Sequence, residues 1–381
     1  MWSLMNNAIT EDDKQELIQF IMSTDMYTNG VKVKQFEKEW SNWLGCKHSL
    51  FVSSGSTANF LLVAAVKELY NIPNGSKVLL PTCTWVTNIG PILQLGLEPV
   101  FCDISLDHFS FDETQLPDED IKLVFVTHLL GINAPFEKVK ERYPNALFIE
   151  DICESHGVTD VNGKRRGSDS SLGSTFSFYY GHHMTTIEGG MISTNNTELY
   201  ELMVIKRSHG MARNHSPEYF KAATEKYPYI HPQFLFLTDG YNFRNTELAA
   251  VLGLCQLKRL DQNIELRKRN YKLFLEILDS FPGVFYIPCR DDTNSSFCLP
   301  MICKNPDDMK KLKNAFTTLK IEHRPIVAGN LLLHPFLSKW KDSCDVTNAN
   351  ILNFNGIYIG NSQFVTEEML QSLKQIIKDF L

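Results

Sequence analysis

The sequence predicts an α/β protein with two parts: a large unit built on a mostly parallel sheet with helices on both faces, and a smaller α+β unit at the C-terminal end. Two patterns lead to this prediction. Short apolar runs alternate with helical patterns from residue 48 to residue 194, which is typical of a buried parallel sheet. A long charged helical run follows at residues 245–278, and fewer strand signals come after it.

Start signals and apolar periodicity place the elements of the large unit. Thr10, followed by three acidic residues, marks the start of a first helix. Phe36, Trp40 and Leu44 lie on one face of a second helix, and residues 60–70 form an apolar third. The buried strands are expected at residues 48–52, 78–80, 100–102, 123–127, 147–150, 174–178 and 191–194.

The helical run at residues 245–278 is too long for an ordinary core helix, and we expect it to carry the chain from one unit to the other. Strands at residues 297–301, 321–327 and 357–359 and a helix at 367–381 then make the smaller unit. We therefore predict a large domain over residues 1–250 and a small domain over residues 251–381.

Composition narrows the class of protein. A net charge of −7 over 381 residues leaves no basic stretch that would neutralise a nucleic-acid backbone. No apolar run approaches the ~20 residues that span a membrane, and the N-terminus lacks the order of a signal peptide. The nine cysteines are scattered, which favours free thiols in a reducing compartment. We expect a cytoplasmic enzyme that binds neither nucleic acid nor membrane.

The segment at residues 176–190, FSFYYGHHMTTIEGG, organises the rest of the interpretation. It opens as a strand, passes through a turn with two adjacent histidines and ends on Glu188-Gly189-Gly190. A second segment, Ser53-Ser54-Gly55-Ser56-Thr57, joins a strand to a helix. Exposed amides and the helix dipole make such a junction an anion site, although similar turns often serve only to cap a helix.

Two more segments carry groups suited to a ligand crevice. Asp151 and Glu154 follow a buried strand, and the carboxyl ends of parallel strands face the usual crevice of such sheets. Trp85 also follows a strand and offers a flat face to an aromatic ring. The plainer alternatives are a solvated acid for Glu154 and a core tryptophan for Trp85.

Together these segments resemble the sugar aminotransferases of the DegT/StrS type, which use pyridoxal phosphate and have the aspartate aminotransferase fold (fold type I). In that family the central segment reads approximately S-F-x-x-x-K-N-x-x-x-x-E-G-G, and the lysine binds the cofactor covalently. Counting forward from Ser177 or back from Gly190 places His182 at the lysine position. The adjacent His183 stands where the family has asparagine.

The resemblance implies a role for each cofactor residue. Gly55, Ser56 and Ser177 would hold the cofactor phosphate. Trp85 would stack on the pyridine ring, and Asp151 would keep the ring nitrogen protonated.

Other roles implied by the resemblance concern the phenolic oxygen, the partner subunit and the substrate. Glu154 would lie near the phenolic oxygen, where relatives carry glutamine or histidine. Asn242 would reach the phosphate of a second subunit, so the resemblance implies a homodimer with shared active sites. The substrate-binding residues implied are Arg207, Arg213, Arg244, Arg324 and His334. Any one of these arginines could instead pair with a surface acid.

Histidine at the lysine position decides which reaction is expected, because an imidazole cannot form a covalent imine with the cofactor. Within the family, the branch with this histidine consists of 3-dehydratases that use pyridoxamine phosphate. The resemblance implies that a nucleotide-linked 4-keto-6-deoxy sugar, with GDP favoured, loses its C3 hydroxyl. Ammonia is released, and glutamate restores the amine form of the cofactor. His182 would be the catalytic base and acid, titrating within about two units of 6.5.

Two alternative functions stay open, and a third, which needs an iron–sulfur cluster, is set aside. The chain could be a nucleotide-sugar aminotransferase, or a non-catalytic relative that binds a nucleotide sugar. A second histidine branch needs an iron–sulfur cluster with four thiolates. The cysteines after the central segment form no C-x-C or C-x₂-C pair, so we expect no cluster and no metal site.

Overall fold

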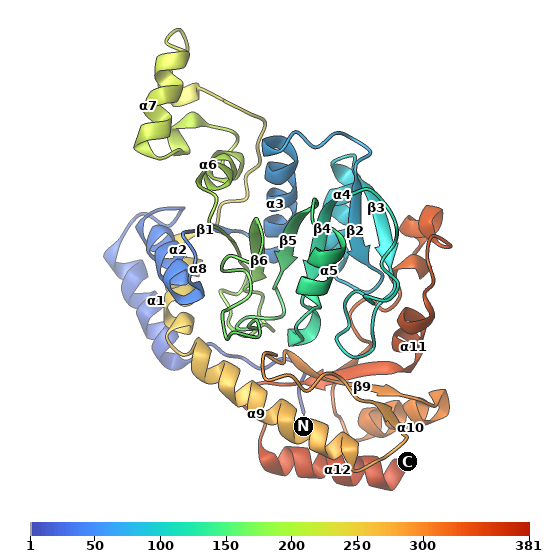
Figure 1. Cartoon of the computed structure of the whole chain (residues 1–381). Helices are drawn as coiled ribbons and strands as arrows, with labels where there is room; N and C mark the ends of the chain where they lie inside the picture. The colour runs from blue at the N-terminus through green and yellow to red at the C-terminus, as the bar shows by residue number, and fades with distance from the viewer. Residues whose placement is uncertain (1) are drawn as a thin grey trace.

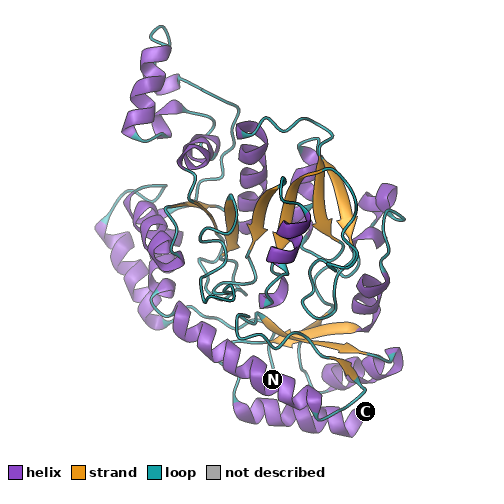
Figure 2. Cartoon of the chain, viewed as in Figure 1, coloured by secondary structure: helices purple, strands orange, loops and turns teal. Residues whose placement is uncertain are grey.

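The computed structural model describes residues 2–381 and contains two sheets, one of seven and one of four strands. Figures 1 and 2 show the larger sheet surrounded by helices, with the smaller sheet below it against a long helix. This arrangement confirms the predicted fold class, a large mostly parallel α/β unit with a smaller α+β unit.

The large sheet has the order β1-β7-β6-β5-β4-β2-β3. Only β7 runs antiparallel to both neighbours; the other pairs are parallel. Nearly every position of these strands is buried, because helices cover both faces. Its strands are β1 His48–Val52, β2 Lys77–Pro81, β3 Glu98–Cys102, β4 Ile121–Thr127, β5 Leu147–Asp151, β6 Gly173–Ser177 and β7 Gly190–Thr194.

Two helical layers enclose this sheet. One face packs against α3 Gly55–Leu69, α4 Gly90–Gln94 and α6 Thr197–Lys206. The other packs against α2 Val31–Leu44, α5 Phe136–Arg142 and α8 Glu247–Leu257, with α1 Glu11–Ser23 outside α8. The short helix α7 Pro217–Lys226 projects away from the body of the molecule (Figure 1).

The helical run expected at residues 245–278 is two helices, α8 and α9 Leu260–Asp279. The break falls at Lys258 and Arg259. Arg259 turns its guanidinium to the start of the chain, where it donates to the Ala8 carbonyl (3.0 Å) and to Asp13 Oδ1 (2.9 Å). The chain then follows α9 into the smaller unit (Figure 1), as the sequence predicts.

The small sheet is antiparallel with the order β10-β11-β9-β8. Its strands are β8 Phe285–Tyr286, β9 Cys298–Cys303, β10 His323–Arg324 and β11 Gly356–Gly360, and its helices are α10 Pro306–Thr318, α11 Thr347–Asn355 and α12 Glu367–Phe380. The strand expected at 321–327 shortens to two residues, because the chain turns back to the large unit. There Leu331 N–H donates to the Thr82 carbonyl (2.9 Å). The domain boundary near residue 250 stays a prediction.

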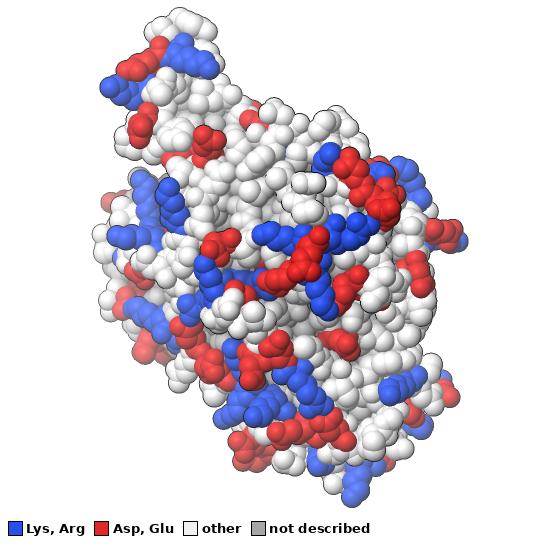
Figure 3. Space-filling model, viewed as in Figure 1, with Lys and Arg blue, Asp and Glu red and all other residues white. Residues whose placement is uncertain are grey.

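Charges of opposite sign are mixed on the face shown in Figure 3, with no extended patch of one sign. Near α5, Arg142 pairs with Asp118 (2.8 Å) and Arg166 with Glu137 (2.7 Å). Among residues 2–381, no helix has the length and apolar character needed to cross a membrane.

The N-terminus of α2 is capped by a side chain from α8. Gly30, which precedes α2, has no side chain to cap it, and Glu247 takes over this function. Its Oε1 accepts the N–H groups of Gly30 (2.9 Å) and Val33 (2.8 Å), and its Oε2 accepts that of Lys32 (2.8 Å). The carboxylate is buried at the positive end of the helix dipole, so it fixes α2 to α8.

Replacing Glu247 with glutamine should lower the free energy of unfolding by about 1–3 kcal/mol, because the amide has one neutral acceptor oxygen in place of the two charged carboxylate oxygens. Urea unfolding followed by circular dichroism measures the change. Glu16→Gln, at an exposed position of α1, is the control and should stay within about 0.5 kcal/mol of wild type. Equal stabilities for the two variants would contradict the capping role.

Candidate active site

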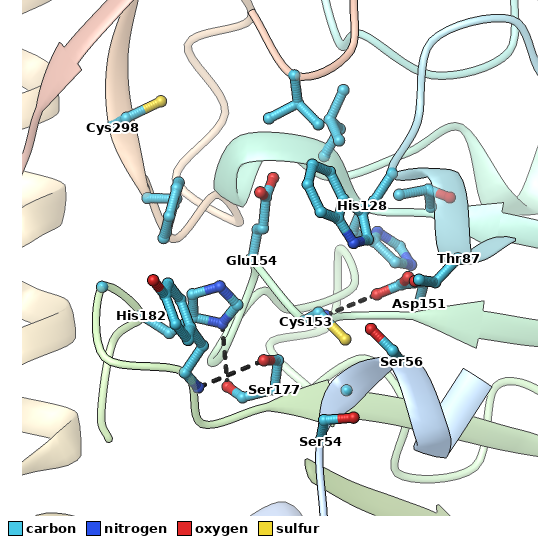
Figure 4. A pocket seen from close by; sticks show the side chains of 18 of the residues that line it. Ser54, Ser56, Thr87, His128, Asp151, Cys153, Glu154, Ser177, His182 and Cys298 are labelled. Atoms are coloured by element: carbon cyan, nitrogen blue, oxygen red, sulfur yellow. Dashed lines mark hydrogen bonds between the residues drawn. The ribbon is translucent and has the colours of Figure 1, made fainter. Parts of the chain in front are cut away.

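A cavity of about 380 Å³ lies at the carboxyl ends of β4, β5 and β6, and residues of the small unit complete its wall. Figure 4 shows His182, Glu154 and Asp151 around this space, with Ser54 and Ser56 at the start of α3 and Ser177 at the end of β6. Of the site residues predicted from sequence, the cavity brings together Gly55, Ser56, Trp85, Asp151, Glu154, Ser177, His182 and Arg324.

Asp151 ends β5 as a buried carboxylate held by three donors. Its Oδ2 accepts the side-chain amides of Asn59 (2.9 Å) and Asn88 (2.8 Å), and its Oδ1 accepts Cys153 N–H (2.9 Å). Thr175 Oγ1 in turn donates to Asn59 Oδ1 (2.6 Å), which fixes the orientation of that amide. The carboxylate therefore has a set direction before any ligand is bound.

Sequence reasoning missed both asparagines that hold Asp151. Asn59 lies in an otherwise apolar stretch of α3, and a buried amide among apolar residues was a signal that could have identified it. Asn88 ends a short 3-10 helix and carries no comparable signal. Its contact with Asp151 joins positions 63 residues apart, which only the fold brings together.

The start of α3 forms an anion cradle. Ser54 caps the helix, and Gly55 and Ser56 open its first turn beside Ser177. A Cβ atom on Gly55 would lie only 2.7 Å from Ser177 Cβ and 3.0 Å from Cys153 Sγ, so only glycine fits this close approach. Free amides at a helix N-terminus favour a phosphate at this place.

These features fit pyridoxal phosphate. The cradle suits the phosphate, and the oriented Asp151 carboxylate suits a protonated ring nitrogen. Trp85 lines the cavity and is 51% exposed, so it is not the core tryptophan of the plainer alternative.

His182 presents one ring nitrogen to the cavity. Because a carbonyl oxygen can only accept, the contact of Nδ1 with the Ser177 carbonyl (3.1 Å) puts the proton on Nδ1 and leaves Nε2 as the basic nitrogen. Burial lowers the pKa of His182 to about 4, against the opposing effects of the Ser177 carbonyl and the Asp151 charge. The imidazole is thus neutral at pH 7, with a pKa further below 6.5 than the sequence led us to expect.

His183 lies in the protein core. It is 1% exposed, and its Nε2 donates to the Ser295 carbonyl (2.8 Å). Its ring packs 5.3 Å from that of His156 and 6.1 Å from that of Phe297, between centroids. His182 is among the residues that line the cavity, and His183 is not.

Glu154 lines the cavity and has a pKa close to neutrality. Burial raises the pKa of Glu154 to about 7; the Asp151 charge adds to the rise, and the N–H group of Leu130, which donates to Oε2 (3.1 Å), opposes it. This carboxyl can therefore be a donor or an acceptor near pH 7.

Five of the predicted residues lie outside the cavity in the single chain. Arg207 is buried in an ion pair with Glu37 (2.7 Å). Asn242 is exposed and accepts the N–H of Arg244 Nε (3.0 Å). Arg213 and His334 are exposed and contact Gln233 (3.1 Å) and the Ala328 carbonyl (3.2 Å) respectively. Their proposed roles stay predictions, and Arg207 has a structural contact instead.

Comparisons of the sequence with a family model and with known proteins agree on one family. The model of the DegT/DnrJ/EryC1/StrS aminotransferase family matches residues 7–377. GDP-4-keto-6-deoxy-D-mannose 3-dehydratase of Yersinia pseudotuberculosis is 34% identical, over 96% of this chain and 96% of its own length. GDP-perosamine synthase of Escherichia coli O157:H7 is 24% identical, over 98% of this chain and 96% of its own.

Solved structures agree with the sequence relatives. A variant of GDP-4-keto-6-deoxymannose-3-dehydratase with bound GDP-perosamine has a TM-score of 0.89 and 30% identity, covering 99% of this chain and 100% of its own. The same kind of enzyme with a trapped pyridoxal phosphate–glutamate geminal diamine has a TM-score of 0.86 and 28% identity, again covering 99% and 100%. These likenesses show the fold type I architecture.

Asn88→Ala should weaken retention of pyridoxal phosphate about 10-fold, because Asp151 loses one of its donors and its set direction. Equilibrium titration followed by cofactor absorbance measures the affinity. Asn162→Ala, on an exposed turn, is the matched control. Unchanged affinity in Asn88→Ala would show that the amide does not support the cofactor site.

Glu154→Gln should change how stability depends on pH. The folded pKa of about 7 lies above the ordinary value of 4.5, so the contribution of this group is present below pH 4.5 and lost as the pH rises through 7. Wild type should therefore lose about 2 kcal/mol relative to Glu154→Gln between pH 5 and pH 8.5, less than the full linkage value because the group faces an open cavity. Urea unfolding at the two pH values measures this; a constant difference would contradict the raised pKa.

Proposed function

Because this chain belongs to the DegT/DnrJ/EryC1/StrS aminotransferase family of pyridoxal phosphate enzymes, we propose that it is a 3-dehydratase of a nucleotide-linked sugar. The substrate is a GDP-linked 4-keto-6-deoxyhexose or a close relative. Its C3 hydroxyl is lost, and the products are a 3-deoxy-4-keto sugar and ammonia. Glutamate restores pyridoxamine phosphate.

One observation carries the proposal: His182 takes the place of the family's lysine on the cavity wall, and no lysine is among the residues that line the cavity. A histidine cannot hold the cofactor as a covalent imine, so the amine form persists. Pyridoxamine phosphate, when bound, supplies the amine that condenses with the C4 ketone and a ring that accepts electrons.

His182 is the residue that transfers protons in this reaction. Its Nδ1–H is fixed by the Ser177 carbonyl, so Nε2 would be the atom that takes a proton from the bound cofactor and gives it to the departing C3 oxygen. The imidazole is neutral at pH 7, so Nε2 carries no proton before the reaction, and a pKa of about 4 makes the imidazolium a strong acid once it forms. Asp151 holds the ring nitrogen protonated, and Glu154 exchanges a proton near the phenolic oxygen.

A second copy of the chain completes this site. Arg324 is the one lysine or arginine among the residues that line the cavity, whereas a cofactor phosphate and a diphosphate bring several negative charges. We propose a homodimer in which Asn242 of one subunit reaches the cradle of the other. Arg213, Arg244 and His334 are then free to bind substrate at the shared site.

The second candidate function is amination of the sugar, as named for the GDP-perosamine synthase that the chain resembles. It shares the fold and the cofactor site, and it differs in the group that moves the proton and in the product. A non-catalytic role is disfavoured by the three donors that orient Asp151, because a sugar-binding scaffold needs no such carboxylate.

The deciding experiment incubates enzyme, pyridoxal phosphate and glutamate with GDP-4-keto-6-deoxymannose and follows products by mass spectrometry. We expect loss of one oxygen from the sugar and one ammonia per turnover. An aminated sugar would establish the second candidate. No reaction with this or other 4-keto nucleotide sugars would contradict both.

His182→Asn should lower this turnover by about 10²–10⁴-fold, because an amide cannot move the proton. Cofactor affinity should stay near wild type, since the cradle and Asp151 are untouched. His183→Asn, which restores the family residue, is the matched control and should retain most activity. The reverse pattern, with His183→Asn inactive and His182→Asn active, would assign the base to His183.

A further inference from the structure

An N-terminal strap, residues 2–9, joins the two units across the cavity. Its first end is fixed in the small unit by Trp2 and Leu4. There Trp2 is 5% exposed and its Nε1 donates to the Gly360 carbonyl (2.8 Å). Leu4 N–H donates to Glu322 Oε2 (2.8 Å). At the other end, the Ala8 carbonyl accepts Gln256 Nε2 of α8 (2.9 Å).

Between these anchors, Leu4 and Met5 line the cavity. Met5 rests on Gly181, the residue before His182. A Cβ atom on Gly181 would lie 2.4 Å from Met5 Sδ and 2.7 Å from Met5 Cγ. Gly181 is not among the glycines with positive φ, so its missing side chain, and not backbone freedom, is what admits Met5.

The cavity therefore has two chemically different walls. The wall from the large unit contains the cradle, Asp151 and most of the polar lining groups, together with Trp85 and Leu129. The wall from the strap and the small unit is mostly apolar, with Leu4, Met5, Phe297 and Val327, and with Arg324 and Tyr358 as its polar members. Since the cofactor groups belong to the polar wall, a sugar that reaches His182 contacts the apolar one.

We propose that Met5, supported by Leu4, contacts the C5–C6 end of the sugar and selects a methyl group over a hydroxymethyl group there. This inference rests on the proposed function. A sugar whose C3 and C4 atoms lie at His182 also lies next to Met5, because Met5 packs on the adjacent Gly181. A thioether and an isobutyl group offer no hydrogen bond to replace the water that a buried hydroxyl loses, whereas they pack well against a methyl group.

Two nucleotide sugars test this selection. They are GDP-D-rhamnose and GDP-D-mannose, which differ only by the 6-hydroxyl group. Isothermal titration of the full chain loaded with pyridoxamine phosphate gives both dissociation constants. Wild type should bind the 6-deoxy sugar about 10–100-fold more tightly. Met5→Gln, of similar length but with an amide, should reduce this ratio to about 3-fold or less.

Gly181→Ala gives an independent variant, because it displaces Met5 without changing it, and it should reduce the ratio in the same direction. Met22→Gln on α1, 82% exposed, is the control and should keep the wild-type ratio. If both sugars bind and neither variant changes the ratio, the inference fails while the proposed function stands. If wild type binds neither probe, the GDP-sugar function fails and the inference with it.

Discussion

The buried carboxylate of Asp151 is the interaction on which the arrangement of the site depends. A charge removed from water is stable only with several donors, and here these come from three places: α3, the short helix before α4, and the backbone after β5. Satisfying Asp151 therefore fixes the start of α3 against the end of β5. The anion cradle and the Asp151 carboxylate share one rigid frame as a result.

His182 uses this frame differently from the lysine of its family. Its Nδ1–H donates to the carbonyl of Ser177 at the strand end that also forms part of the cradle, so the second ring nitrogen, Nε2, keeps its direction relative to the cradle. Burial keeps the ring neutral at pH 7, and it raises the pKa of Glu154 to about 7. Under the proposed function, this one substitution exchanges covalent attachment of the cofactor for proton transfer.

Local sequence predicted the sheet well, because its strands are buried on both faces and read as apolar runs. The expected strands all appear, within a few residues of their predicted bounds. Two predictions failed at places where the chain makes distant contacts: the long helix is broken at Arg259, which contacts Asp13, and the chain after Arg324 leaves its strand and pairs near Thr82.

The site shows the same difference between residues that local sequence identifies and residues that only the fold brings together. Gly55, Asp151, Ser177 and His182 lie at strand ends or in turns with recognisable patterns, and the cavity contains all of them. Asn88 and the strap residues Leu4 and Met5 were not identified, since they reach the cavity only through the fold. Asn242 and Arg244 carry a recognisable pattern, but neither is among the residues that line the cavity of the single chain.

The central claim is that the cofactor is held without a covalent bond to the chain. Intact-protein mass spectrometry after borohydride reduction of the enzyme with pyridoxal phosphate tests it directly. The account predicts the unmodified mass for wild type and a cofactor adduct for His182→Lys. A reduced adduct on any lysine of the wild-type chain would contradict it.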